Sequence, residues 1–276
     1  MIAFERHRRT AVNGRLELVF ALRGTDTSLA HAYVSAPLKI VRPFPLAGGG
    51  LLVQILTLGP GLCAGDDCRI DVTVERGARA VVIMQAASRI LGMAEGTQAT
   101  QSVNLVVAPG GQLEYYPGLT IPFADSCFQQ RVKIAADPQS RLGIVECWAT
   151  GRRTRGEYLR FRRLSSRTVV TIDGQPVFAD ALEIDANSNL AAGSGILEGH
   201  EYVASGFWHG VPPDSSIAVA GTDALVAFGR TTSPEQVFLR ALAHDGFAMS
   251  SLVQSAVDII ARAWGSEPIP IRRFVS

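Results

Sequence analysis

The sequence lacks the features of membrane-spanning, secreted and zinc-binding proteins. No run of about 18 apolar residues is present to cross a bilayer, and no apolar segment of a secretory signal follows Met1. The four cysteines form no Cys-x-x-Cys pair and have no histidine at zinc-finger spacing. We therefore expect a soluble cytoplasmic protein without a structural zinc site, whose thiols are reduced and mostly buried.

Net charge of one sign is also missing. Lys39 and Lys133 are the only lysines among 26 basic residues, and these are balanced by 25 acidic residues to give a formal charge of +1. Binding to nucleic acid or an anionic membrane scales with the number of phosphates neutralised. Neither partner is expected.

Local catalytic motifs are absent as well. There is no Gly-x-Ser-x-Gly elbow, His-Glu-x-x-His motif, Walker loop or EF-hand. The glycines at 48–50 and 59–61 lack the Lys and Ser/Thr of a phosphate loop and are interpreted as turns. The five histidines are scattered, so only a triad assembled from distant Ser, His and Asp residues is left as an enzyme hypothesis.

What the sequence does contain is β-strand patterning. Leu16, Leu18, Phe20 and Leu22 alternate with less apolar residues, and a similar alternation runs through 69–74. Gly, Pro, Asn and Asp turn signals separate further β-rich runs at 51–58, 79–84, 103–107, 142–148, 168–172 and 217–228. We predict one mainly β domain over 1–276, β-rich over 10–230, with stacked or sandwiched sheets.

A strand, turn, strand cadence recurs about every 30 residues. It begins near Val74, Val107 and Ile134, and its first two copies turn at Gly77 and at Gly110. Such copies are typical of the rungs of a solenoid-like sheet, although a meander of hairpins gives a similar pattern.

The tail changes period. Ser233, Pro234 and Glu235 resemble a helix start, and Gly246 offers a stop. Apolar residues then recur at three- and four-residue steps from Leu252 to Trp264, before Gly265. We predict two C-terminal α-helices within 233–264, with an apolar face to bury against the sheet or a partner.

Two groups of charged residues are candidate functional residues. The arginines between 152 and 167 alternate as if on one face of a strand pair, which suits either a solvated face or the polar rim of an interface. Four carboxylates stand among apolar or glycine-rich residues, where burial requires an ion pair or a bound cation: Asp66, Glu114, Glu146 and Glu157.

Several segments together resemble the UreD (UreH) family of urease accessory proteins. Residues 36–44 are similar to its Pro-Leu-Lys-x-x-Arg-Pro-Phe pattern, and Gly65 and Asp66 close a segment similar to its Gly-Gly-Leu-x-x-Gly-Asp turn. The other matching segments are 14–20, 84–89, 113–117, 120–123, Glu146, 151–152 and 156–157. Met84, Arg89 and Tyr115 depart from the family pattern, which has Thr, Lys and Trp there.

The resemblance implies a scaffold that catalyses nothing and helps to insert nickel into apo-urease together with the proteins UreF and UreG, in a complex that can dimerise. No tightly bound cofactor is implied, only nickel in transit. Its route is expected to involve the four carboxylates and Cys63, because hard oxygens suit weak nickel contact and Cys63 is a soft ligand beside the Asp66 turn. The expected partner contacts are Arg152, Arg155, Arg240, Gln254 and Trp264.

Two alternatives stay open from the residues alone. One is a β-sandwich binding module unrelated to nickel, and the other is a hydrolase with a distributed triad. Urease genes beside the gene for this chain would favour the maturation hypothesis over the binding module.

Overall fold

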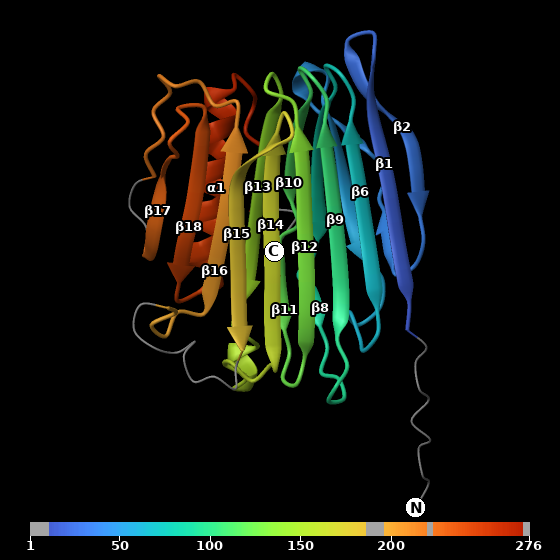
Figure 1. The fold of residues 1–276 in the computed structure, drawn as a ribbon, viewed down its shortest axis with the longest axis vertical. Coiled ribbons are helices and arrows are strands. Elements are labelled where there is room, and N and C mark those ends of the chain that lie inside the picture. The colour runs from blue at the N-terminus through green and yellow to red at the C-terminus, as the bar shows by residue number, and fades with distance from the viewer. Residues whose placement is uncertain (1–10, 186–195, 220–222, 273–276) are drawn as a thin grey trace, which may run out of the picture.

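Two β-sheets stacked face to face form the body of the protein in a computed structural model, which describes residues 11–185, 196–219 and 223–272 (Figure 1). The front sheet contains, in spatial order, β15 (Gln175–Asp185), β14 (Arg163–Ile172), β12 (Cys127–Ala136), β9 (Ala99–Val107), β6 (Asp67–Val74), β1 (Asn13–Arg23) and β2 (Asp26–Val34). The back sheet contains β17 (Ala224–Arg230), β18 (Gln236–Ala243), β16 (Tyr202–His209), β13 (Arg141–Ala149), β10 (Gln112–Tyr116), β7 (Arg79–Gln85), β5 (Leu51–Thr57) and β3 (Leu38–Ile40). Attached to the back sheet are β4 (Phe44–Pro45), β8 (Ser88–Ile90) and β11 (Leu119–Pro122).

The predicted repeat is confirmed and has a structural cause. Each copy is a tight turn that leads from a front strand to a back strand: β6 to β7, β9 to β10, and β12 to β13. Successive copies pair in parallel in both sheets, so the chain winds as a solenoid. The turns also stack through backbone hydrogen bonds, such as Ala108 N to Val74 O at 2.9 Å and Asp137 N to Val107 O at 3.0 Å. Gly77 and Gly110 both have φ near +70°, which favours glycine in the first two turns.

The core has two layers. The alternating residues of β1 and β6, among them Leu16, Phe20 and Val72, pack between the two sheets against residues such as Ile144 and Phe207. A second cluster lies between the outer face of the back sheet and α1 (Gly246–Ala263), and includes Trp208, Val237, Leu252, Ile260 and Trp264. Two short 3₁₀ turns, η1 (Ala47–Gly49) and η2 (Arg153–Arg155), lie in loops.

The tail has one α-helix rather than the two predicted. Residues 236–243 form strand β18, which is paired on both sides with β16 and β17. Its side chains alternate in burial, with Val237, Leu239 and Ala241 on one face. Pro234 and Glu235 belong to the turn that precedes this strand. Gly246, predicted to end a helix, instead begins α1, because the Asp245 side chain accepts the Ala248 N–H at 2.8 Å and caps the first turn.

Two further predictions, on the arginines after residue 152 and on the strand at 217–228, differ from the structure. The arginines at 152–162 do not alternate on a strand pair; they lie in the loop between β13 and β14, which includes η2, and β14 begins only at Arg163. The strand expected at 217–228 is β17, which runs from Ala224 to Arg230, while 220–222 lie outside the described residues. No helix in the described ranges is long and apolar enough to cross a membrane.

Candidate functional site

Glu146 lies in the interior between the two sheets. It is the third inward position of β13, after Leu142 and Ile144, and its residue is 6% exposed. The carboxylate accepts hydrogen bonds across the core from two front strands, one from the Gln130 side-chain amide and one from the Thr168 hydroxyl at 2.5 Å. The fold therefore gives a single buried carboxylate neutral hydrogen-bond donors.

This environment changes the acidity of Glu146. The pKa of Glu146 is raised from the ordinary 4.5 to about 7, mainly by burial and in addition by the negative charge of Asp180. The hydrogen bonds from Thr168 and Gln130 act in the opposite direction and lower it. The Tyr115 hydroxyl is also buried, and its pKa is raised by burial and by the charge of Glu146. A carboxyl group with a pKa near neutrality exchanges its proton readily at physiological pH.

Polar residues continue from Glu146 towards one edge of the sandwich. The Ser205 hydroxyl, one strand along the back sheet, donates to Asp180 of β15, and Arg240 of β18 forms an ion pair with the same carboxylate. A small internal cavity of about 10 Å³ is lined by these residues together with Glu146, Ser166 and Thr168. That volume is about what one water occupies.

On the facing sheet, the polar side chains lie in one row. Gln101, Gln130 and Ser166 are direct neighbours in the parallel register of β9, β12 and β14, and all three are buried. The row runs across the strands rather than along them. Together with Glu146 it makes a belt of oxygen and amide groups through an otherwise apolar core, and we call it the Glu146 belt.

Glu114 faces the opposite side of the back sheet, towards the layer that contains α1. Its carboxylate accepts from Gln112 Nε2 and from the Tyr116 hydroxyl, both at 3.1 Å, and lies 3.8 Å from the Arg79 guanidinium. Burial raises its pKa although the charge of Arg79 opposes the shift. Glu114 thus lies beside a half-buried arginine, separately from Glu146.

Asp66 fixes the turn that carries Cys63. Its carboxylate accepts the backbone N–H of Val12 at 2.9 Å and of Cys63 at 2.8 Å, and it is 1% exposed. The Cys63 thiol is half-buried and points towards the Gly61 carbonyl at 3.8 Å. The structure therefore brings together the two residues that the sequence placed at the entrance of a nickel route.

Glu157 is the carboxylate with an arginine partner of its own. It accepts from Arg152 Nε at 2.7 Å, from a second nitrogen of the same guanidinium, and from Ala124 N at 3.1 Å. Arg152 in turn stacks over the Phe123 ring at 3.8 Å. The hydrogen bond from Arg152 is the main cause of a lowered pKa at Glu157. This group of contacts closes the loop between β13 and β14.

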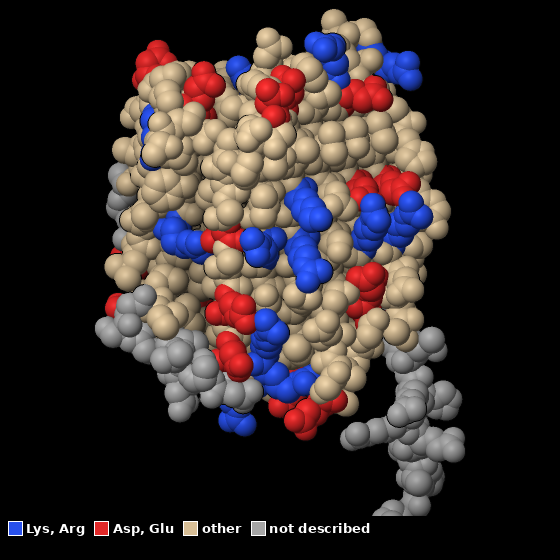
Figure 2. Space-filling view, in the orientation of Figure 1, with Lys and Arg blue, Asp and Glu red and all other residues tan. Residues whose placement is uncertain are grey.

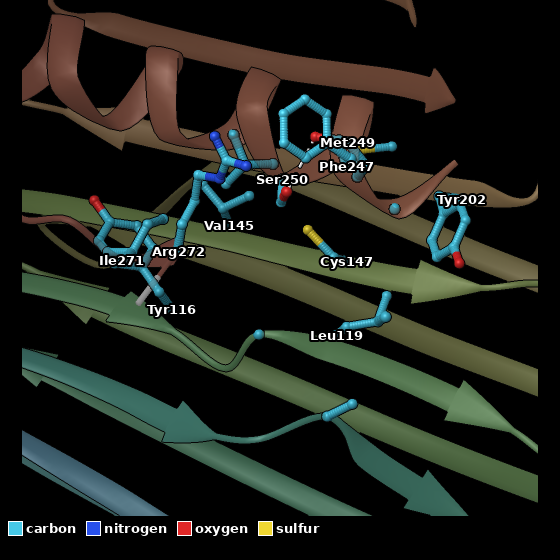
Figure 3. A pocket seen from close by; sticks show the side chains of 14 residues that line it. Tyr116, Leu119, Val145, Cys147, Tyr202, Phe247, Met249, Ser250, Ile271 and Arg272 are labelled. Carbon is cyan, nitrogen blue, oxygen red and sulfur yellow. Dashed lines mark hydrogen bonds between the residues drawn. The ribbon is translucent and has the colours of Figure 1, made fainter. Parts of the chain in front are cut away.

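Beside the start of α1, an apolar groove of about 620 Å³ opens on the outer face of the back sheet (Figure 3). Phe247, Met249 and Ser250 of the helix lie along one side, and Leu119 and Cys147 of the sheet lie across from them. Phe247 is 72% exposed, and its ring lies under the Arg272 guanidinium at 4.6 Å. A large exposed aromatic ring at the mouth of an apolar groove is typical of a protein-binding surface.

The predicted partner residues lie in different settings. Gln254 holds the C-terminal segment on α1: it donates to the Ile269 carbonyl at 2.8 Å and accepts from Arg272 N at 3.1 Å. Trp264 is buried, and its indole N–H donates to the Gly210 carbonyl at 2.9 Å. Arg155 is exposed in η2, whereas Arg240 lies on β18 in the ion pair with Asp180 of β15.

Metal ligands do not gather in a cage in the part of the chain that the structure describes: no three His, Cys, Asp or Glu side chains form a group that could hold a metal ion. Sequence reasoning missed one close pair, His200 and His244, whose rings stack 4.0 Å apart. It also missed Asp180 and Ser205. The inward, period-two position of Ser205 on an apolar strand is the signal that could have found it.

Comparisons with known proteins point to one family. The sequence model described as "UreD urease accessory protein" matches residues 12–276. Urease accessory protein UreD 1 of Synechococcus sp. (strain JA-3-3Ab) is 40% identical over 196 residues, which cover 71% of this chain and 73% of the relative. Urease accessory protein UreD of Deinococcus radiodurans is 33% identical over 276 residues, 96% of each chain. The protein of that name from Acetivibrio thermocellus is 33% identical over 180 residues, 65% of this chain and 68% of the relative.

Proposed function

This chain belongs to the UreD family of urease accessory proteins, and from that premise we propose that it carries nickel to apo-urease in a complex with UreF and UreG. In this proposal nickel is cargo, which passes through the protein without a resident metal site. The chain catalyses no reaction of its own and acts in the cytoplasm.

The observation that carries the proposal is the Glu146 belt. A buried carboxylate surrounded by neutral hydroxyl and amide groups can take up a cation by releasing a proton, because its pKa of about 7 makes the two states similar in free energy. Divalent nickel binds strongly to imidazole and thiolate ligands, and more weakly to one or two carboxylates with water. Weak oxygen ligands therefore suit release at the end of a route.

Asp66 and Cys63 are proposed at the entrance of this route, and Glu114 and Glu157 as further carboxylates along it. The contacts of these carboxylates support a role in nickel transfer to different degrees. Glu157 and Glu114 each lie beside an arginine, whereas Glu146 receives its hydrogen bonds from neutral groups. We therefore assign Glu146 the largest role in nickel transfer.

The groove beside α1 is proposed as the UreF contact, with Phe247 as its exposed aromatic anchor and Gln254 as the residue that positions the neighbouring C-terminal segment. Arg152 and Arg155 at η2 and Arg240 on β18 extend the proposed partner contacts, and Trp264, buried at the end of α1, is proposed to support this surface from beneath. Apolar grooves of this kind accept one face of a partner helix.

The test is urease activation with purified components. Glu146→Gln keeps the shape of the side chain and removes its charge, and Glu75→Gln is a matched control at an exposed position. We expect Glu146→Gln to fold and to capture UreF and UreG, while the nickel content and activity of urease fall well below those obtained with Glu75→Gln. Full activation by Glu146→Gln would exclude the proposed route.

A further inference from the structure

Four arginines form a row on the outer face of the front sheet. Arg15, Arg69, Arg131 and Arg167 occupy the same register position on β1, β6, β12 and β14, and Ser102 of β9 completes the row. Figure 2 shows this row as a band of basic side chains across the middle of the face. Five strands at about 4.8 Å spacing make the row about 19 Å wide.

The two halves of the row differ in their counter-charges. Arg15 forms an ion pair with Glu17, and Arg69 pairs with Asp71 at 2.6 Å, so β1 and β6 neutralise their own arginines two residues further on. Two residues after Arg131 and Arg167, where β1 and β6 have a carboxylate, β12 has Lys133 and β14 has Val169. Among the described residues, no carboxylate forms an ion pair with Arg131, Lys133 or Arg167.

Arg131 and Arg167 are also direct cross-strand partners. Like charges opposite one another on neighbouring strands are destabilising. The fold thus keeps three positive charges together on β12 and β14 where pairing within the chain would have relieved the repulsion, as it does on β1 and β6. A carboxylate-bearing partner would supply the missing counter-charge.

We propose that Arg131, Lys133 and Arg167, which we call the basic band, dock an acidic surface of a protein partner. The face is open, because α1 packs on the other sheet (Figure 1). Two residues beyond Lys133, the cross-strand neighbours Val106 and Ala135 are exposed apolar residues, and Val106 is 45% exposed. Arginine beside exposed apolar side chains is the composition of a protein interface.

A protein surface fits the band better than a phosphate polymer or an anionic membrane. Carboxylates lie at both ends of the same face, above and below the band in Figure 2, where they would repel a strand of phosphates. Binding to a nucleic acid draws its affinity from many neutralised phosphates, roughly six to ten for a strongly salt-dependent DNA-binding protein, and the band offers three unneutralised charges.

The inference rests on the proposed function for the choice of partners, since apo-urease, UreF and UreG are the three proteins to be measured. The double variant Arg131→Gln/Arg167→Gln removes two of the three unneutralised charges and leaves Lys133 in place. The double variant Arg15→Gln/Arg69→Gln removes the same amount of charge from the self-neutralised half and is the matched control.

We expect the first double variant to weaken binding to one of the three proteins by about tenfold at low salt, and to reduce the salt dependence of that binding. The control should change the same dissociation constant less than about threefold. Both variants should stay folded, because the altered side chains are exposed. The first should melt at or slightly above the wild-type temperature, since it removes the repulsion between Arg131 and Arg167, and the control at or slightly below it, since it removes two surface ion pairs. The charge reversal Arg131→Glu should weaken binding further than Arg131→Gln.

Equal binding of all three partners by wild type and the first double variant would overturn the inference and leave the proposed function intact. Equal weakening by both double variants would also overturn it, since that result assigns the effect to overall charge. Tighter binding of a 20-base-pair DNA duplex or of anionic vesicles than of any protein would replace it with a different partner class. Failure of the wild type to bind any of the three would overturn the proposed function itself.

Discussion

Replacing Glu146 by Gln tests the central site independently of urease, because it should change the pH dependence of stability. In the folded protein the pKa of Glu146 is about 7, and in the unfolded chain it returns to about 4.5. Each pKa unit corresponds to about 1.4 kcal/mol. The ionised carboxylate therefore lowers the free energy of unfolding by about 3 kcal/mol at pH 8 relative to pH 4.

The sign follows from proton counting. Between pH 4.5 and 7 the folded protein binds more protons at this position than the unfolded chain, so stability falls as pH rises through that window. Below it both states are protonated, and above it both are ionised. Glutamine cannot ionise, so the variant should lose this part of the pH dependence while keeping an acceptor and a donor for Thr168 and Gln130.

The assay is thermal or urea unfolding of wild type and Glu146→Gln at pH 5, 6, 7 and 8. The two proteins should be similar at pH 5 and diverge until the variant is more stable by about 3 kcal/mol at pH 8, a melting difference of roughly 6–12 °C for a chain of this size. Parallel profiles for the two proteins across this range would refute the buried, raised-pKa carboxylate on which the nickel proposal depends.

Three other outcomes are expected. Glu157→Gln should lower the free energy of unfolding by about 1 kcal/mol at pH 7, because it removes the partly exposed pair with Arg152. This difference from the wild type should vanish as pH falls through the lowered pKa of Glu157. Urea unfolding at pH 7 and pH 3 measures it, and a difference that is the same at both pH values would contradict the ion pair. Gly143→Ala should destabilise by about 1–3 kcal/mol, since a Cβ there would lie 2.7 Å from Trp208 Cδ1; an unchanged melting temperature would argue against this packing. The purified chain should turn over neither urea nor GTP, and a turnover abolished by one substitution would contradict the accessory role.

The sheets were predictable because their signals are local. Alternation over residues 16–22 reflects one buried face, and the turns at Gly77 and Gly110 follow from the cadence of three short segments. The pairing partners of these strands were not predictable from alternation alone. Parallel stacking in two sheets depends on the equal length of successive turns. This equality was hard to see in the sequence, because the third copy of the repeat, near Asp137 and Pro138, resembles the first two only weakly.

The misassigned helix shows where local signals fail. Ser233, Pro234 and Glu235 satisfy the rules for a helix start, yet the following residues lie between β16 and β17 and complete their hydrogen bonds. Pairing on both sides satisfies more backbone groups than a short helix could. The apolar face of residues 237–243 is then used by the core under α1.

The site was predictable in its residues but not in its environments. All four carboxylates could be selected because they interrupt apolar segments, but the contacts that distinguish them come from distant parts of the chain. Glu157 lies five residues from its arginine, whereas Glu146 meets Thr168 and Asp180 only after the solenoid has turned. The face of the back sheet on which Glu114 and Glu146 lie also depends on strand register.

Among the described residues, Glu146 is the buried carboxylate of this set that pairs with neither an arginine nor a backbone N–H. Glu157 stabilises a loop through Arg152, Asp66 accepts two backbone N–H groups, and Glu114 has Arg79 within 4 Å, although burial raises the pKa of Glu114 as well. Glu146 occupies an inward position of β13 between Ile144 and Trp148, where an apolar residue would pack without a charge penalty. Strand β13 instead carries an acid whose ionisation works against folding at neutral pH. A group that lowers stability in this way is better explained by function than by the scaffold. A proton-exchanging carboxylate in a polar belt is the arrangement that the proposed nickel route needs.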